Sequence, residues 1–357
     1  MDKNRRDHTR FLMIGFAASL VIGILFFALS AAATVHDTKK LIEEAQISRG
    51  EPSGKEDQPD KPDEGETKEA EATTEEAETT TEPESTEPQT TQEVYTTDAE
   101  YANFNDGAIR ALTAEEIAAI EGSTDTSQRG FGTGFTDPKN ELGRPSYVTS
   151  VEEDMKNAGI NGRCFCADAD TKKASITFQA GYESGHTEQI LMLLAQNSVK
   201  STFYVTHEYG WNNPELLQKI IDQGHEIGNH SYSAPEEGIA TKPLQYQMDD
   251  ALRMQSYMEE NYGYTMRKYN YNSGVFTLAS AKMMSEMGYE VCFCSVNYDD
   301  FSETTEFDAN SILNSLLSCA HNGVVYCFHI NNKVTAEILP GLIYYLRSEG
   351  YEIVQMP

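Results

Sequence analysis

Cysteine and histidine are the residue types in this chain that most readily take part in chemistry. All six cysteines lie between Cys164 and Cys327. Two pairs, Cys164/Cys166 and Cys292/Cys294, are spaced so that both members share one face of a predicted strand. A metal site on either pair would need two further ligands, and a disulfide within a pair has poor geometry on a strand. We therefore predict buried, free thiols, although an exported domain would permit several disulfide pairings.

The six histidines after residue 126 fall into two groups. Four have no partner spacing that indicates a site: His186, His207, His225 and His321. His230 and His329 differ, because each comes directly after a predicted strand. In α/β folds with parallel strands, chemistry is concentrated at the C-terminal ends of the strands. These two positions are therefore the ones to examine, with a hydrogen-bonded structural histidine as the simpler interpretation of His230.

Short apolar segments alternate with amphipathic helices from about residue 126 onward. Residues 174–178 and 201–205 are predicted strands, and the helix between them begins near Thr187. A second helix begins at Pro214, because proline is favoured at the first helical position. The composition of this part of the chain is that of a globular domain.

One small pattern recurs along this domain. A glycine ends an amphipathic helix and a strand follows at Gly224, Gly288 and Gly350, and Gly323 precedes the strand at 324–328. Glycine suits the left-handed residue that ends a helix. Strands that alternate with helices favour a parallel sheet or a barrel, and periodicity alone does not choose between them.

The sequence at the predicted strand ends carries a family resemblance. Five segments contribute to it: residues 177–181 (Thr-Phe-Gln-Ala-Gly), 230–234 (His-Ser-Tyr-Ser-Ala), 270–274 (Asn-Tyr-Asn-Ser-Gly), 297–301 (Asn-Tyr-Asp-Asp-Phe) and 324–329 (Val-Val-Tyr-Cys-Phe-His). In this order they resemble the five motifs of the polysaccharide deacetylase (NodB-homology) family, most closely its peptidoglycan deacetylases. The resemblance covers residues 126–357. It implies a deformed (β/α) barrel that removes N-acetyl groups from amino sugars with a divalent metal.

The first three motifs depart from the family pattern where its chemistry is carried. Gln179 stands where the family has its general base, an aspartate, and Ala180 stands at the second acid position, where the related branch of the family has Asn or Ala. Of the two metal-binding histidines only His230 remains, because Ala234 takes the place of the other. Asn270 replaces the arginine that tunes the base. An amide cannot serve as a general base near neutral pH, and losing one costs about 10²–10⁴-fold in rate.

The last two motifs keep more of the pattern. In the fourth, Asn297 replaces an aspartate, whereas Asp300 matches the residue that orients the catalytic acid. In the fifth, His329 matches the general acid itself. A catalytic zinc usually has three protein ligands, which His230 alone cannot provide. We therefore expect no cofactor, with zinc as the alternative if the protein is active.

Three functions remain open on this basis. The replaced catalytic and metal-binding residues all belong to one predicted site. This favours a pseudoenzyme whose ligand is either a glycan such as peptidoglycan or a wall protein. The first alternative is a hydrolase of amino-sugar N-acetyl groups that uses an atypical site built on His329 and Asp300. The second is a structural or scaffolding domain. Four tyrosines in or beside the motifs are candidate sugar contacts, since aromatic rings stack on sugar faces, or else ordinary packing residues: Tyr182, Tyr232, Tyr271 and Tyr298.

The N-terminal region predicts a membrane anchor. Residues 11–35 hold no charged side chain, and about 20 residues in a helix span a bilayer. The basic residues within 1–10 indicate that this end stays in the cytoplasm and that the rest is exported. A cleaved signal peptide is the alternative, although the apolar run is long for one. The expected location is thus the cell membrane, crossed once, with the C-terminal domain outside.

Residues 36–125 are predicted to be a linker that is disordered where Glu, Thr and Pro dominate. Residues 51–100 contain 18 acidic residues and 3 lysines, a net charge of −15 out of −30 for the whole chain. Such a segment cannot bury enough apolar surface to fold. The pattern also suggests a short helix near residues 113–120 without an assigned role. No basic stripe exists to neutralise phosphates, which argues against a nucleic-acid partner.

Overall fold

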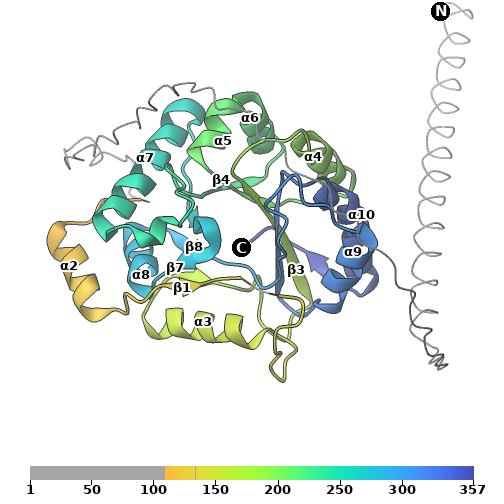
Figure 1. Cartoon of the computed structure of the whole chain (residues 1–357), viewed down its shortest axis with the longest axis horizontal. Helices are drawn as coiled ribbons and strands as arrows, with labels where there is room; N and C mark the ends of the chain where they lie inside the picture. The colour runs from red at the N-terminus through yellow and green to blue at the C-terminus, as the bar shows by residue number, and fades with distance from the viewer. Residues whose placement is uncertain (1–108, 133) are drawn as a thin grey trace, which may run out of the picture. The chain divides into compact units, whose positions relative to one another are not determined.

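The computed structural model describes residues 109–132 and 134–357 (Figure 1). The predicted cytoplasmic end, the anchor at 11–35 and most of the linker lie outside these residues. Within the described part of the chain, no helix is both long enough and apolar enough to span a membrane.

Parallel strands form the centre of the domain. Within residues 109–132 and 134–357, one sheet contains β2 (Gly162–Arg163), β3 (Lys173–Ala180), β4 (Thr202–Val205), β5 (Glu226–Asn229), β6 (Lys268–Tyr269), β8 (Glu290–Cys292), β9 (Val324–His329) and β10 (Glu352–Ile353). Its order is β10-β3-β4-β5-β6-β8-β2, and β9 also pairs with β3. All of these pairings are parallel, as the alternation of strands and helices predicted.

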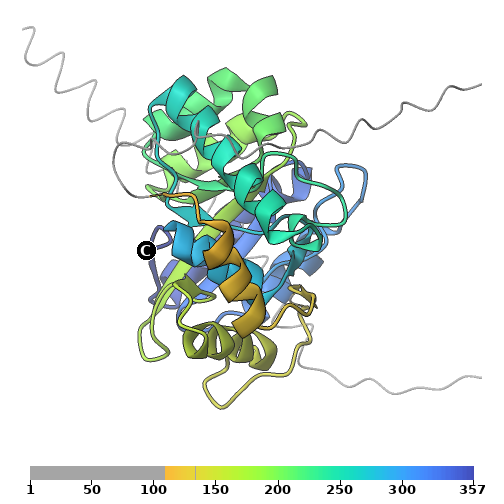
Figure 2. The same ribbon diagram turned by 90° about the vertical axis from the view of Figure 1, so that its left-hand side faces the viewer.

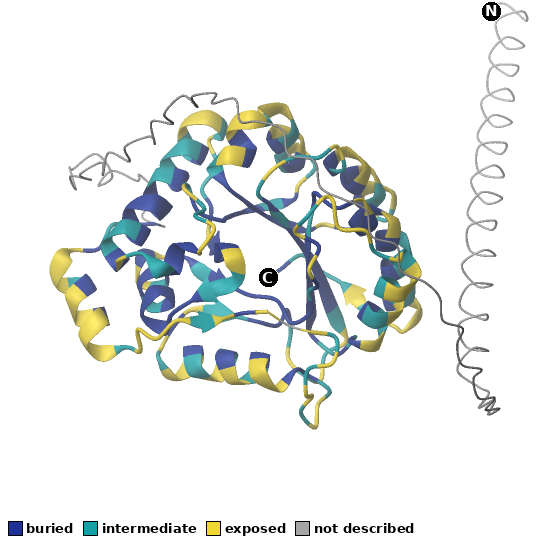
Figure 3. Cartoon of the chain, in the orientation of Figure 1, coloured by how far each residue is buried: buried dark blue, intermediate teal, exposed yellow. Residues whose placement is uncertain are grey.

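The helices surround this sheet. They are α3 (Ser146–Asn157), α4 (Thr187–Gln196), α5 (His207–Asn212), α6 (Pro214–Asp222), α7 (Leu244–Tyr262), α8 (Leu278–Met287), α9 (Ala309–Ser318) and α10 (Lys333–Ser348). Figure 1 shows them around the strands, and Figure 3 shows that their inner faces are buried while their outer faces are exposed. The arrangement is a deformed α/β barrel, and the expected fold class is confirmed to that extent.

The barrel is distorted at one seam. On one side of β3, β9 pairs along its whole length, from Ala174 opposite Val324 to Gln179 opposite His329. On its other side β9 meets the chain after β8 through a single bridge, between Val296 and Tyr326. A separate antiparallel pair, β1 (Arg129–Gly130) with β7 (Val275–Phe276), and the short 3₁₀ turns η2 (Ile239–Thr241) and η3 (Asn272–Gly274) lie outside the main sheet.

Local sequence explains where these elements end. Gly224, Gly288, Gly323 and Gly350 all have positive φ, as the helix–glycine–strand pattern predicted. A different glycine, Gly228 on β5, is required for space, because a Cβ there would lie 2.4 Å from the Tyr204 ring. Tyr204 is fully buried, so this glycine allows a large aromatic side chain to fill the barrel.

The folded domain begins earlier than residue 126, where sequence analysis placed its start. Ile109, Leu112, Ile117 and Ile120 are all buried in the same apolar core as the barrel. They belong to α2 (Ala114–Ser123) and the segment before it, and α2 contacts α7 and α8 (Figure 2). A capping box at Thr113 and Glu116 starts this helix. The expected linker therefore ends before Ile109, because its last apolar residues cover the barrel.

The cysteines are buried and unpaired. All six are free in the structure, including the two pairs that share strand faces. Burial raises the pKa of Cys166 and of Cys292 to about 12, so these thiols stay protonated at neutral pH. Such thiols pack as small apolar side chains.

Candidate functional site

The C-terminal ends of four strands meet at one place. Gln179 on β3 lies opposite His329 on β9, and these two residues are register partners. His230 follows β5 directly, and Asn270 follows β6 directly. The structure therefore brings together four of the predicted site residues, which lie up to 150 positions apart in the sequence. Their contacts divide the site into two parts.

The first part, which we call the acid corner, consists of His329 and Asp300. The Nδ1 atom of His329 lies 2.8 Å from Oδ1 of Asp300, whose carboxylate is fully buried. The other oxygen, Oδ2, accepts the backbone N–H of His329 at 2.9 Å and the hydroxyl of Thr335 at 3.1 Å. Burial by itself would lower the pKa of His329, but the hydrogen bond and charge of Asp300 outweigh it and the pKa is raised.

This geometry orients His329 for proton transfer. Because Nδ1 is held by Asp300, Nε2 is the ring atom left to exchange a proton with a bound molecule. The side chain of His329 is 30% exposed, so the imidazole is accessible while its partner is not. The acid corner therefore has the contacts expected of an acid and its orienting carboxylate.

The second part, which we call the amide corner, consists of Gln179, Asn270 and His230. Nε2 of Gln179 donates a hydrogen bond of 2.8 Å to Oδ1 of Asn270. The amide nitrogen of Asn270 in turn donates to the carbonyl of Cys292 at 2.8 Å. The two amides thus hold each other in place without a charge on either side chain.

His230 completes the amide corner as a neutral side chain. Its Nδ1 lies 2.9 Å from the backbone carbonyl of Asn270, and the residue is almost fully buried. Burial lowers the pKa of His230 to about 4, and the nearby His329 contributes to the same direction. At neutral pH the ring is therefore uncharged and donates from Nδ1, as in the structural interpretation given above.

These residues do not fit a catalytic zinc ion. One ring nitrogen of His230 is occupied by a backbone carbonyl, so a single nitrogen remains as a ligand. Gln179 and Ala234 contribute neither an imidazole nor a carboxylate. In the described residues, no group of three or more His, Cys, Asp or Glu side chains is arranged to hold a metal ion. Zinc sites need at least three such ligands.

A buried carboxylate that sequence analysis missed shapes the loop after His230. Asp250 on α7 accepts hydrogen bonds from the hydroxyl of Ser231 and from the backbone N–H groups of Tyr232 and Ser233, all at 2.7–2.8 Å. Ser231 and Ala234 both have positive φ, a strained conformation that these bonds hold in place. No local sequence pattern indicated this role, because the contact joins segments that are 17–19 residues apart.

The remaining predicted positions are placed as follows. Ala180 is fully buried beside Gln179 and does not line an opening, whereas Asn297 is half-buried. Tyr271 is also buried, and its hydroxyl lies 2.7 Å from that of Ser280. Tyr298 is buried against Phe135. Tyr271 and Tyr298 are therefore packing residues, which is one of the two interpretations given for them, and the interpretation as sugar contacts does not hold for these two.

Two of the four tyrosines retain surface at this end of the barrel. Tyr182 is 42% exposed and its hydroxyl lies 3.4 Å from the carbonyl of Phe301. Phe301 itself is 61% exposed and its ring meets that of His329 edge-on, with centroids 6.4 Å apart. Tyr232 is half-buried. Aromatic rings thus lie beside the acid corner, where they can contact a bound molecule.

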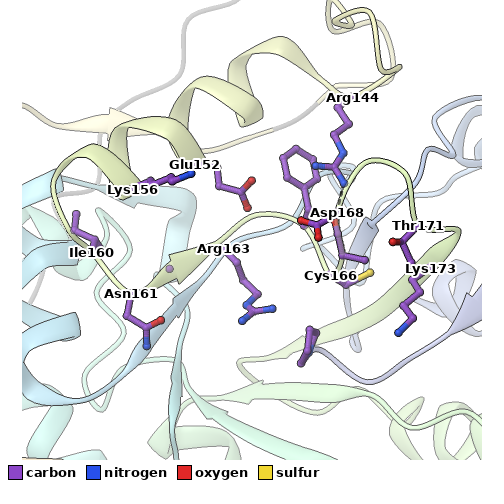
Figure 4. A pocket seen from close by; sticks show the side chains of 14 residues that line it. Arg144, Glu152, Lys156, Ile160, Asn161, Arg163, Cys166, Asp168, Thr171 and Lys173 are labelled. Atoms are coloured by element: carbon purple, nitrogen blue, oxygen red, sulfur yellow. Dashed lines mark hydrogen bonds between the residues drawn. The ribbon is translucent and has the colours of Figure 1, made fainter.

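A cavity of about 690 Å³ lies away from this site, at the N-terminal ends of β2 and β3 (Figure 4). Two arginines that line it are engaged by the fold. Arg163 binds Glu290 at 2.5 Å, and Arg144 donates to the carbonyls of Ala167 and Asn322. None of the predicted site residues lines it. The volume of this cavity therefore does not identify the candidate site, which lies at the C-terminal ends of the strands.

Comparisons with known proteins identify the family to which the chain is similar. The family model described as "Polysaccharide deacetylase" matches residues 167–292. The peptidoglycan-N-acetylmuramic acid deacetylase PdaA of Bacillus subtilis is 31% identical over 184 residues, which cover 50% of this chain and 68% of that protein. The peptidoglycan-N-acetylglucosamine deacetylase PgdA of Listeria monocytogenes is 27% identical over 186 residues, 51% of this chain and 38% of PgdA.

A solved structure supports the fold. The structure of Bacillus subtilis PdaA, a family 4 carbohydrate esterase, superposes with a TM-score of 0.58 at 23% identity, and the match covers 64% of this chain and 95% of that one. The two chains thus share the fold of a deformed α/β barrel. The chain belongs to the polysaccharide deacetylase family.

Proposed function

We propose that this protein is a polysaccharide deacetylase family member that binds the amino-sugar chain of peptidoglycan and does not deacetylate it with a metal. The observation that carries the proposal is the hydrogen bond of 2.8 Å between Gln179 and Asn270. At these positions the family motifs have the general base and the arginine that tunes it. Here two neutral amides satisfy each other, so neither can take a proton from water.

The ligand set supports the same proposal. Deacetylation by a metal-bound water requires a metal to lower the pKa of that water. His230 is the one metal-binding histidine of the motif that remains, and Ala234 offers no ligand. The kept features are those of recognition: an accessible His329, the exposed rings of Tyr182 and Phe301, and a family whose relatives act on peptidoglycan.

Binding is tested by isothermal titration of the full-length chain with chitooligosaccharides and with muropeptides. We expect saturable heat with the longer glycans, and weaker binding for the variant Phe301→Ala. The variant Leu142→Ala removes an equally exposed apolar side chain, 62% exposed, and should bind like the wild type. The absence of heat for every glycan would contradict the proposal and favour a scaffolding role.

One observation favours a second function, hydrolysis of N-acetyl groups at an atypical site. The acid corner is complete, because His329 and Asp300 keep the contact of 2.8 Å that orients an acid. Under this alternative, acetate is released from an N-acetylated glycan, and release stops in the variant His329→Ala. Membrane anchoring through residues 11–35 is a further part of the proposal, and fractionation of cells that express the full chain tests it.

A further inference from the structure

Three aromatic rings are stacked in a row beside the amide corner, and we call this row the aromatic ladder: Trp211, His207 and Tyr232. The rings of His207 and Tyr232 lie nearly parallel, 24° apart, with centroids separated by 4.0 Å. Trp211 also stacks on the imidazole of His207, with centroids 5.8 Å apart and an angle of 30° between the rings. The guanidinium of Arg253 lies 4.3 Å from the centre of the Tyr232 ring.

The ladder begins in the candidate site. Tyr232 is two residues after His230, and the backbone N–H of His207 donates to the carbonyl of Ser231. The helix that carries Trp211, α5, starts two residues after β4 ends at Val205. The ladder therefore extends from the C-terminal ends of β4 and β5 outward, on the same end of the barrel as Gln179 and His329.

The ladder is held in place by contacts on its inner side. Thr206 caps α5, because its hydroxyl accepts the N–H of Tyr209 at 3.2 Å and also donates to the carbonyl of Gly181. The ring of Tyr257 meets the His207 ring edge-on at 4.7 Å. Burial and the charge of Arg253 lower the pKa of His207, so the ring between the two others is neutral at neutral pH.

The outer end of the ladder is open to solvent. Trp211 is 67% exposed, the largest exposed fraction among the large apolar side chains of the described residues. A tryptophan that stays at the surface although its ring is stacked and positioned offers a flat apolar face with a polar edge. Pyranose rings present a matching flat face of C–H groups, and stacking on an aromatic ring requires no charge on the sugar.

We propose that Trp211 and the ladder form a second carbohydrate subsite, which binds a sugar ring of a β-1,4-linked amino-sugar chain whose other residues occupy the candidate site. This inference rests on the proposed function, because it requires a glycan at the strand ends. It adds a length requirement: a short oligosaccharide reaches the acid and amide corners only, whereas a longer one also covers Trp211.

The chain contains a single tryptophan, so its fluorescence reports this position alone. The full-length chain is titrated with chitobiose and with chitohexaose while emission and heat are both recorded. We expect chitohexaose to change the Trp211 emission in a saturable way, and chitobiose to bind without changing it. The variant Trp211→Ala should bind chitohexaose about tenfold more weakly, and its affinity for chitobiose should stay the same.

Two further variants separate stacking from folding. Trp211→Phe retains an aromatic face and should bind chitohexaose within about twofold of the wild type. Leu142→Ala, at a similarly exposed apolar position, should change neither affinity. Heat with chitohexaose but no emission change and no loss in Trp211→Ala would overturn the subsite and leave the proposed function standing. No heat with either sugar would overturn both.

Discussion

The two corners of the candidate site differ in charge although they share one set of strand ends. In the acid corner, a buried carboxylate and an imidazole form a contact of 2.8 Å, and the pKa of His329 is raised. In the amide corner, Gln179 and Asn270 are equally close, at 2.8 Å, but both are neutral, and the pKa of His230 is lowered. One barrel end therefore keeps its geometry although the amide corner carries no charge at neutral pH.

The largest effect is expected from removing the carboxylate of the acid corner. Asp300→Ala leaves His329 and Thr335 without their acceptor in a buried place, so the free energy of unfolding should fall by about 3 kcal/mol or more. Urea unfolding measures it. The neighbouring Asp299 is exposed, and Asp299→Ala should cost less than about 0.5 kcal/mol. Equal effects of the two variants would mean that the acid corner is not a buried unit.

The two imidazoles should respond to pH in opposite directions. In the folded protein His230 takes up its proton only near pH 4, whereas the unfolded chain takes it up near pH 6.5, so stability falls as the pH drops between these values. At pH 4 the free energy of unfolding should be lower by about 3 kcal/mol because of His230. The variant His230→Asn should not show this part of the pH dependence.

The raised pKa of His329 has the reverse consequence. Its protonation stabilises the fold below the unfolded pKa of about 6.5, and this contribution is lost as the pH rises through the folded pKa. Imidazole resonances followed by NMR as a function of pH test both signs. If His230 and His329 titrate together near pH 6.5, the contrast between the corners is wrong.

The amide pair should behave as a coupled unit of intermediate strength. Gln179→Asp replaces a donor by a carboxylate that faces the Asn270 oxygen, and it should destabilise the protein by about 1–3 kcal/mol. Combining it with Asn270→Arg supplies a cation, and a double-mutant cycle should show a favourable coupling of about 1 kcal/mol or more. Additive effects would show that the two side chains do not depend on each other.

The smallest effect concerns a single hydrogen bond to Asp300. Thr335→Val keeps the shape of the side chain and removes one of the three bonds that the carboxylate accepts, at 3.1 Å. The expected cost is about 1 kcal/mol, measured by thermal unfolding. A cost as large as that of Asp300→Ala would mean that Thr335, and not His329, is the main partner of the carboxylate.

Sequence patterns predicted the elements better than the contacts between them. The strands at 174–178 and 201–205, the helix at Pro214 and the three glycine-terminated helices were predicted, because these depend on local preferences. The predicted start of the domain was wrong. The apolar residues of 109–120 follow a polar segment in the sequence, and their burial depends on tertiary packing against the barrel.

The candidate site shows the same limit. The motif order placed Gln179, His230, Asn270 and His329 at strand ends, and their meeting follows from the parallel sheet. Spacing could not show that Tyr271 points into the core, because a residue after a strand can face either side. Nor could it pair Asp250 with the loop after His230, a contact between distant segments that depends on tertiary packing.

The most direct test of the account measures metal content and acetate release together. The full-length chain is purified, offered zinc, cobalt and manganese in turn, and incubated with an N-acetylated glycan strand. We expect less than stoichiometric metal in each case and no acetate above the rate without protein. Stoichiometric metal accompanied by turnover would contradict it, and would mean that the amide corner recruits ligands that the structure does not bring together.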